Sequence, residues 1–385
     1  MQREVLQKIL KDNKEYSLYH RYITNEHIIP LLNDFRSEYD VKIIGNSVNL
    51  EPINSITVGH GPKKILIWSQ MHGNESTTTK ALFDILNVFK SKNKIVDTII
   101  TNCTLKIIPI LNPDGARLYT RLNANKIDLN RDAQEISQPE TLVLINTFND
   151  FKPDFCYNLH GQRTIFSAGT ANKSAAISFS APAQNYEKEI TRNRRQAMEI
   201  IIKMNEVLQN LISNQIGIYD DSFNLNCIGD TFQSNNTPTI LIEAGHLKND
   251  YSRENVRGLL SFALIHSLIF IANNTVTGNS YLDYLNIPKN KKLFFDVIIR
   301  RAKINENSKE LDIGIRYNEV LKRGKVQFIP KVERLQDLSS FFGHFEINVE
   351  GSLVLGLNNE CLVEGYENDF VLINNEIFAL KSTKI

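Results

Sequence analysis

The chain has 385 residues, of which 42% are hydrophobic and 23% are charged, and its formal net charge at pH 7 is +1. This length accommodates one large α/β domain and a smaller second domain, and the composition is typical of a globular protein. A net charge so close to zero gives no reason to expect binding to nucleic acid or to an anionic membrane surface.

The sequence predicts neither a targeting segment nor a membrane span. Charges interrupt residues 1–6, unlike a signal peptide. The longest apolar stretch, 259–272, is too short to cross a bilayer and is expected to be a buried helix. The four cysteines form no CxxC pair, so we expect reduced thiols and a cytoplasmic protein.

In chain order, residues 1–50 come first, and apolar side chains recur there at helical spacing. This pattern predicts an N-terminal helical extension. Strand-like and helix-like patterns then alternate over residues 51–275. Strands are expected at 64–70, 105–110, 154–159 and 238–242, and helices at 76–90, 141–150, 187–214 and 252–273. The alternation predicts an α/β fold with a mixed, mostly parallel sheet and helices on both faces.

The pattern changes after residue 273. Residues 274–279 have the polar, glycine-containing composition of a linker. Short runs rich in Val, Ile and Phe then follow one another, separated by turn residues. Residues 280–385 are therefore predicted to form a small β-rich domain.

Polar residues that are able to do chemistry follow four of the expected strands. His72 follows the first strand, Asn112 the second, His160 the third and Glu243 the fourth. The carboxyl ends of parallel strands meet at one edge of a sheet, where α/β proteins bind their ligands. We therefore expect these residues to share one site.

His72 and Glu75 form a short-spaced pair of metal-binding side chains, and His160 is a distant third. A catalytic zinc ion usually takes three protein ligands and keeps a fourth position for water, so we expect one Zn²⁺ per chain. A glycine follows each histidine, and we expect it to let the backbone turn sharply there. The alternative for the pair alone is a solvated loop histidine beside an unrelated glutamate.

Glu243 is the candidate general base. It ends the apolar run 239–242, and a buried carboxylate is costly unless it is used or paired. In hydrolysis it takes a proton from water and passes it to the leaving amine. The alternative is a glutamate held in a structural salt bridge.

The segment 112–132 supplies positive charge through Arg117, Arg121 and Arg131. A guanidinium can hold a carboxylate through two parallel hydrogen bonds, or stabilise the oxyanion of a tetrahedral intermediate. All three arginines could instead be solvated, and this alternative is strongest for Arg117.

With these residues in place, the sequence resembles the M14 zinc metallocarboxypeptidases. The shared motifs, in family order over about residues 50–275, are HGNE at 72–75, NPDG at 112–115, DLNR at 128–131, NLHG at 158–161 and IEAG at 242–245. The resemblance implies the zinc carboxypeptidase-like fold. It also implies that the zinc ligands are His72, Glu75 and His160, and that Glu243 is the catalytic glutamate.

The same resemblance implies substrate-binding roles. Asn130 and Arg131 match the pair that holds the terminal carboxylate of the substrate, and Arg121 looks like the arginine that stabilises the oxyanion. Tyr219 lies 24 residues before Glu243 and is the candidate for a tyrosine that closes over the substrate, although a core or surface tyrosine is the alternative. Specificity is expected from the same neighbourhood, where the candidates are Ile228 and Asp230. An acidic Asp230 would favour a basic or amino-bearing group, or would simply cap a turn.

The leading hypothesis is a zinc carboxypeptidase that removes the C-terminal residue of a peptide. The alternative is an N-acyl amino acid deacylase like succinylglutamate desuccinylase and aspartoacylase, which share the HGNE motif and a β appendage. Either substrate carries a free carboxylate. A β domain over the site entrance would exclude peptides, while an open groove would admit them.

A third hypothesis is a non-catalytic binding protein. It would need to have lost a metal ligand or the general base, and none of these residues is missing. The oligomeric state stays open.

Overall fold

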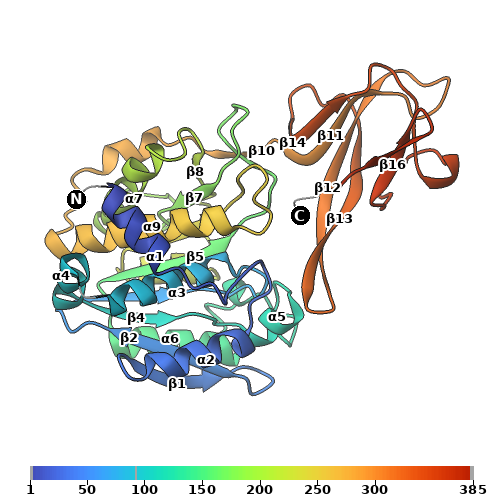
Figure 1. Ribbon diagram of the computed structural model, residues 1–385. Coiled ribbons are helices and arrows are strands. Elements are labelled where there is room, and N and C mark those ends of the chain that lie inside the picture. Colours follow the sequence, from blue (N-terminus) through green and yellow to red (C-terminus); the bar gives the residue numbers. More distant parts are fainter. Residues whose placement is uncertain (1–2, 92, 382–385) are drawn as a thin grey trace.

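The computed structural model describes residues 3–91 and 93–381, and its largest feature is an eight-stranded sheet with helices on both sides (Figure 1). The strand order is β1-β2-β4-β3-β5-β9-β7-β8. The bounds are Asp40–Asn46 (β1), Pro52–Val58 (β2), Lys63–Trp68 (β3), Cys103–Ile108 (β4), Phe155–Gly161 (β5), Ile177–Ser180 (β7), Ile216–Ile218 (β8) and Thr239–Ala244 (β9). Strands β4, β3, β5 and β9 are parallel to one another. At one edge, β2 is antiparallel to both β4 and β1. Toward the other edge, β7 is antiparallel to β9 and parallel to β8. The expected α/β architecture is confirmed.

Two apolar cores cover the two faces of this sheet. On one face lie α1 (Arg3–Asp12), α2 (Asn25–Phe35), α3 (Thr77–Lys90), α4 (Lys94–Asn102), α7 (Arg192–Gln209) and α9 (Glu254–Asn273); on the other lie α6 (Pro139–Phe151) and α8 (Ile228–Ser234). In β3, Ile65 and Ile67 enter the first core, and Leu66 and Trp68 enter the second. Successive strand residues point to opposite faces, so a strand covered on both sides is apolar throughout.

The N-terminal 50 residues differ from the expectation of a purely helical extension. The helices α1 and α2 are present, but β1 follows them and pairs with β2 at the edge of the main sheet. Val41 and Phe35 are both buried in the first core. The prediction that residues 40–46 are helical was wrong. An edge strand with one buried face carries too few apolar residues to show a clear alternation of apolar and polar side chains. Residues 1–2 and 382–385 of the predicted domains lie outside the described part.

Helix α9 is long and apolar enough to cross a membrane by length and composition alone, and 67% of its apolar window is buried inside the protein. It packs against α3, α4 and α7. Such burial is what a core helix shows, as expected for the stretch 259–272.

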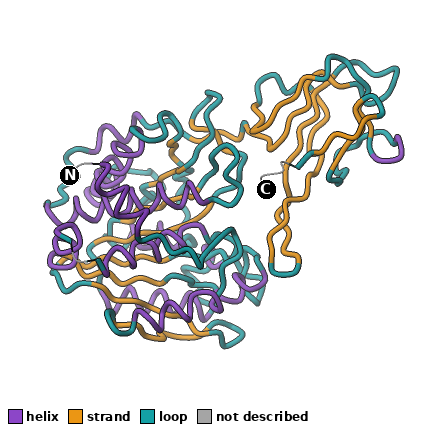
Figure 2. The backbone as a smooth tube through the Cα atoms, in the orientation of Figure 1, coloured by secondary structure: helices purple, strands orange, loops and turns teal. Residues whose placement is uncertain are grey.

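The C-terminal part is β-rich, as expected, and is drawn in orange and red in Figure 1. A four-stranded sheet has the order β13-β12-β11-β14, and a three-stranded sheet the order β15-β16-β17. The bounds are Phe294–Ala302 (β11), Leu311–Lys322 (β12), Lys325–Gln336 (β13), Phe342–Asn348 (β14), Val354–Leu355 (β15), Phe370–Ile373 (β16) and Glu376–Ala379 (β17). The long β12–β13 hairpin extends back toward α5 (Pro113–Leu118), as Figures 1 and 2 show.

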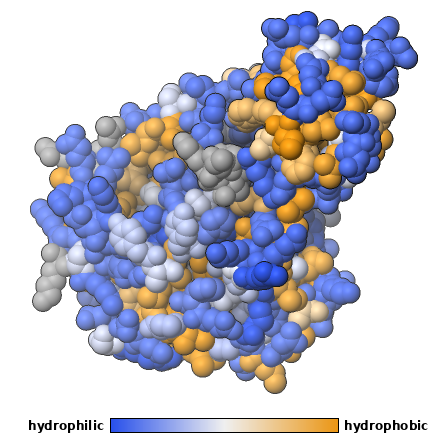
Figure 3. All heavy atoms as spheres, turned by 45° about the vertical axis from the view of Figure 1, so that its right-hand side comes forward, coloured by the Kyte–Doolittle hydropathy of each residue, from blue (hydrophilic) through white to orange (hydrophobic). Residues whose placement is uncertain are grey.

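This C-terminal part is joined to the rest of the chain by more than a linker. Strand β10 (Asn290–Lys292) pairs with β6 (Phe166–Ala168), which belongs to the large α/β part. Tyr119 and Tyr251 enter the apolar core of the C-terminal sheets. Figure 3 shows that this part also exposes apolar side chains on its outer surface. The shared core fixes the hairpin against the carboxyl edge of the large sheet.

Candidate active site

The HGNE segment is held against the NPDG segment by close backbone packing. A Cβ atom on Gly73 would lie 1.9 Å from the backbone carbon of Gly115, so only glycine fits. The expected sharp turn is present after His72, where the Glu75 N–H donates to the His72 carbonyl at 3.0 Å, whereas Gly161 continues β5 and does not turn. Neither glycine has a positive φ. The left-handed residue in this loop is Gln70 (φ 49°), whose side-chain amide donates to the Gly73 carbonyl at 2.8 Å.

His72, Glu75 and His160 converge on one point, although His72 and Glu75 lie in the loop between β3 and α3 and His160 lies near the end of β5. The Nδ1 atoms of His72 and His160 are 3.1 Å apart. The Glu75 carboxylate lies 3.0 Å from Nδ1 of His72 and 3.1 Å from Nδ1 of His160. Both imidazoles are 2% exposed. A terminal nitrogen of Arg121 also lies 3.2 Å from Nδ1 of His72. The ligand atoms of the three side chains all lie within 4.8 Å of one another, an arrangement that could hold a metal ion.

Asp128 fixes the orientation of His72. Its carboxylate accepts from Nε2 of His72 at 3.1 Å and from Nε of Arg121 at 3.0 Å. With the proton on Nε2, the lone pair of Nδ1 points at the other two donors, as metal binding requires. Burial opposes the charge on Asp128, but His72 and Arg121 hold the pKa of its carboxyl well below the usual range.

The geometry fits zinc. At zinc–nitrogen distances of about 2.0–2.1 Å, two tetrahedral ligand atoms lie roughly 3.3 Å apart, close to the separations observed here. Two imidazoles and one carboxylate are a known donor set of catalytic zinc sites. The sequence expectation that these residues hold one zinc ion is therefore compatible with the structure.

Glu243 stands beside this cluster because of strand register. Strands β5 and β9 are parallel, and His160 is paired with Glu243, so both side chains point to the same face. The Glu243 carboxyl is 7% exposed, and its Oε2 has no hydrogen-bond partner among the described residues. Burial and the negative charge of Glu75 raise the pKa of Glu243 well above its usual value. A raised pKa suits a group that takes up and returns a proton near neutral pH.

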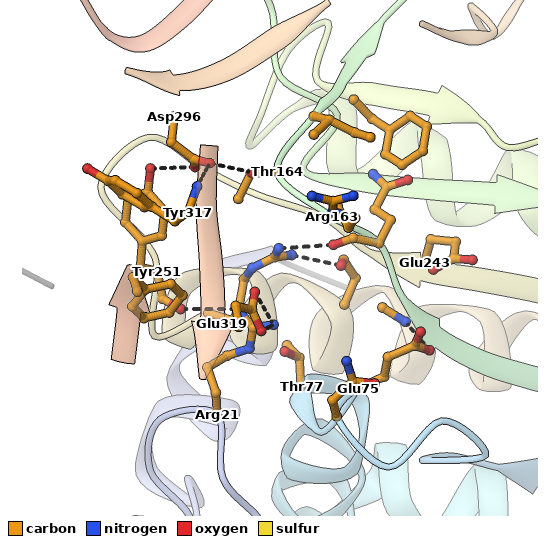
Figure 4. A pocket seen from close by; sticks show the side chains of 18 of the residues that line it. Arg21, Glu75, Thr77, Arg163, Thr164, Glu243, Tyr251, Asp296, Tyr317 and Glu319 are labelled. Atoms are coloured by element: carbon orange, nitrogen blue, oxygen red, sulfur yellow. Dashed lines mark hydrogen bonds and ion pairs between the residues drawn. The ribbon is translucent and has the colours of Figure 1, made fainter. Parts of the chain in front are cut away.

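A cavity of about 630 Å³ opens beside these residues. Figure 4 shows Glu75 and Glu243 on one side of it and the C-terminal residues Asp296, Tyr317 and Glu319 on the other. The cavity lies between the α/β part and the hairpin side of the β-rich part.

Arg121 and Tyr219 both line this cavity. A terminal nitrogen of Arg121 lies 3.6 Å from the Glu75 carboxylate, and the side chain is 45% exposed. Tyr219 follows β8, and its ring meets that of Phe166 edge-on at 5.4 Å. Burial and then the charge of Glu243 raise the pKa of the Tyr219 hydroxyl, so it stays protonated and able to donate.

Asn130 and Arg131 do not line the cavity. The Asn130 side-chain oxygen accepts from the backbone N–H of Ile228 at 3.0 Å, at the start of α8. The exposed Arg131 guanidinium donates to the Asn130 carbonyl at 2.6 Å and to Sγ of Cys227 at 3.0 Å. Asp230 is close by, and burial raises the pKa of its carboxyl to about 7. These residues form a second polar group beside the metal ligands, and their contact with substrate stays a prediction.

The NPDG motif and Arg117 form local contacts that stabilise the fold around α5. The Asn112 side chain accepts from the Gly115 N–H at 2.8 Å and caps α5, and the Asp114 carboxylate accepts from the Asn49 N–H at 3.1 Å. Arg117 forms an ion pair with Glu51, away from the cavity. Arg117 is not among the residues that line the cavity, and the structure assigns it no contact with the candidate metal ligands.

The sequence analysis assigned no role to three residues that shape the site. Asp128 belongs to the DLNR motif, and an acidic residue that orients a ligand histidine is a common feature of metal sites that could have suggested its role. Arg21 of the N-terminal segment and Glu319 of β12 line the cavity and are paired at 2.9 Å. Nothing in the local sequence brings residues 298 positions apart together.

The fold and the site define the class of this protein as a metallocarboxypeptidase-like hydrolase. Its candidate metal ligands have the pattern HxxE…H, and a buried glutamate lies on β9, next to the strand that carries His160. The family model of zinc carboxypeptidase, peptidase M14, matches residues 28–233. The chain therefore belongs to this family, which confirms the resemblance seen in the sequence.

Individual relatives are more distant. Carboxypeptidase SOL1 of Arabidopsis thaliana is 29% identical over 163 residues, which cover 36% of this chain and 33% of that protein. Gamma-D-glutamyl-L-diamino acid endopeptidase 1 of Lysinibacillus sphaericus is 32% identical over 83 residues, covering 20% of this chain and 21% of that protein. The chain thus spans about a third or less of these curated relatives.

Solved structures share the fold. A metallo-carboxypeptidase from Burkholderia cenocepacia superposes with a TM-score of 0.53 at 17% identity, over 65% of this chain and 70% of that one. A carboxypeptidase A-like protein from Shewanella denitrificans gives a TM-score of 0.54 at 16% identity, over 64% and 69%. The unmatched third of this chain is enough to include the β-rich C-terminal part.

Proposed function

We propose that this protein hydrolyses the amide bond to the C-terminal residue of a short peptide, with one zinc ion held by His72, Glu75 and His160. The observation that carries this proposal is the register of β5 and β9, which places Glu243 beside His160. A general base next to a metal-binding cluster is the minimum arrangement for hydrolysis by an activated water.

Each residue then has a chemical role. Bound zinc would lower the pKa of a water molecule and polarise the scissile carbonyl. Glu243 takes the proton of the attacking water and returns it to the leaving nitrogen. Arg121, half-exposed at the cavity wall, donates to the oxygen that becomes negative in the tetrahedral intermediate. Asn130 and Arg131 hold the terminal carboxylate, and Tyr219 donates its protonated hydroxyl toward the bound substrate.

The test uses Glu243→Gln, which keeps the size of the side chain but removes the base. Metal analysis of purified protein should find about one zinc per chain in both the wild type and the variant. Release of amines from a panel of C-terminal peptides should fall by roughly 10²-fold or more in the variant, the scale of general acid–base catalysis. Full activity of the variant, or a wild-type protein that binds no zinc, would contradict the proposal.

A second candidate, hydrolysis of N-acyl amino acids, is favoured by one observation. Residues of the C-terminal part line the cavity, so the β-rich part closes the site on that side. A volume of about 630 Å³ also lies within the range of roughly 300–1,000 Å³ that holds small molecules. Rates measured on acyl amino acids and on peptides of increasing length separate the two candidates, because only a peptidase keeps its rate when residues are added before the scissile bond.

A further inference from the structure

The charges around the cavity are unevenly matched. Among its lining residues are five basic side chains, Arg21, Arg121, Arg163, Arg253 and Lys292, and four acidic ones, Glu75, Glu243, Asp296 and Glu319. Two of the acids belong to the metal centre and the general base. The other two, Asp296 and Glu319, belong to the C-terminal part, and their partners decide whether any basic group is left without a counter-charge.

Both C-terminal acids are already satisfied. Glu319 accepts from Arg21 at 2.9 Å and from the hydroxyl of Tyr119 at 2.5 Å. Asp296 accepts from the hydroxyl of Tyr251 at 2.8 Å and from the backbone N–H of residue 317 at 2.9 Å. These bonds fasten the C-terminal wall to the α/β part, and neither carboxylate forms an ion pair with Arg163, Arg253 or Lys292 in the described part of the chain.

Three basic groups remain without a carboxylate. Within residues 3–91 and 93–381, the exposed side chains of Arg163 and Lys292 have no hydrogen-bond or ion-pair partner. Arg253 is 1% exposed and donates only to the carbonyls of Ala244 and Gln162, at 2.8 and 3.0 Å. A buried guanidinium with no carboxylate on it adds positive potential to the cavity above it.

The fold directs Lys292 and Arg163 toward the cavity. In β10, the side chain of Asn290 turns inward and donates to Gln162 at 3.0 Å. Residues two apart in a strand share a face, so Lys292 follows Asn290, while Lys291 points away. Arg163 lies three residues after His160, and in Figure 4 it stands between the Asp296 side and the Glu243 side of the cavity.

We infer that the acyl part of the substrate, on the side of the scissile bond away from Asn130 and Arg131, carries a carboxylate that Arg163 and Lys292 bind. The inference rests on the proposed function and narrows its substrate class. The substrate is then a dianion, with one carboxylate on each side of the scissile amide: a short peptide with an acidic residue or cap before the bond, or a dicarboxylic N-acyl amino acid. A guanidinium and an ammonium at one wall form charge-assisted hydrogen bonds to such a group.

The experiment compares matched probes on the zinc-loaded full chain. N-succinyl amino acids and N-succinyl dipeptides carry the extra carboxylate, and their N-succinamoyl counterparts replace it with an amide of the same shape. The ratio of kcat/KM for the two members of a pair is measured for the wild type, for the double variant Arg163→Gln with Lys292→Gln, and for Lys291→Gln. The last variant removes a neighbouring surface charge that points away from the cavity.

The wild type and Lys291→Gln should prefer the succinyl member by about tenfold or more, the scale of one or two partly exposed charge-assisted hydrogen bonds. In the double variant this ratio should fall toward one. A wild-type ratio near one, or an unchanged ratio in the double variant, overturns the inference. If no probe is hydrolysed, the proposed function fails separately. Calorimetric binding of the same pairs to Glu243→Gln still tests the subsite, since equal affinities overturn the inference and a tenfold difference supports it.

Discussion

Replacing Asp128 with asparagine should weaken metal binding without unfolding the protein. Asp128 contacts no substrate in the proposed mechanism. It contacts the candidate ligand His72, whose Nε2 lies 3.1 Å from the carboxylate, and the neighbouring Arg121. Asparagine has the same shape but no charge, and its amide can turn its NH₂ group toward Nε2. The imidazole then loses the acceptor that keeps its proton on Nε2 and its Nδ1 lone pair on the metal.

The size of the effect follows from the contacts that are lost. Asp128 is one charged acceptor on one ligand, with a side chain 19% exposed, and it also holds Arg121 at 3.0 Å. Loss of such an outer partner typically costs 10- to 100-fold in metal affinity. At about 1.4 kcal/mol per factor of ten, this amounts to roughly 1.4–2.8 kcal/mol of binding free energy.

The assay is competition for zinc with a chromogenic chelator, run on the wild type, Asp128→Asn and Glu135→Gln. Glu135 is an exposed acid in the same loop, and its variant should match the wild type. Circular dichroism checks that all three are folded. A zinc affinity of Asp128→Asn within twofold of the wild type would refute the reasoning, because it would mean that Nδ1 of His72 is oriented without its acidic partner.

Three other perturbations test packing, electrostatics and pH dependence, all by denaturant unfolding. Gly73→Ala places a Cβ against the Gly115 backbone and should destabilise the protein by roughly 3 kcal/mol or more. Gly258→Ala, at an exposed α9 position with open space around it, should instead stabilise the protein by up to about 1 kcal/mol. Equal effects of the two substitutions would contradict the close packing of Gly73 against Gly115. Glu319→Ala leaves the largely buried Arg21 without its carboxylate and should cost about 3 kcal/mol, while Glu306→Ala, at an exposed position in the same C-terminal part, should have little effect. His246 packs against Tyr251 and His344, and burial, followed by the effects of His344, Arg253 and Arg21, lowers its pKa well below the usual value. Below about pH 6.5 the unfolded chain therefore binds a proton that the folded chain does not, and stability should fall as the pH drops from 7.5 to 5.5. His246→Phe should reduce this fall, and an identical pH dependence in the variant would show that His246 does not cause it.

The sequence determined the fold class and identified the candidate metal ligands. Strands β3, β5 and β9 are continuous apolar runs because helices cover both faces of the sheet, and such runs are readable without a structure. Parallel strands bring their carboxyl ends to one edge, so residues after three different strands were expected to meet. The structure brings His72, Glu75 and His160 within hydrogen-bond distance of one another and places Glu243 next to His160.

Tertiary structure alone decided what surrounds that centre. Strand β1 was missed because a half-exposed edge strand shows little periodicity. The cavity wall was missed because Arg21 and Glu319 are paired across nearly the whole chain, and no local pattern encodes such a contact. Arg163 and Lys292 line the same cavity from distant parts of the chain, so the sequence alone could not indicate that both face the substrate space. Sequence identifies the candidate metal ligands and general base because they lie in short motifs at or just after strand ends, while the shape and charge of the cavity depend on how distant segments pack.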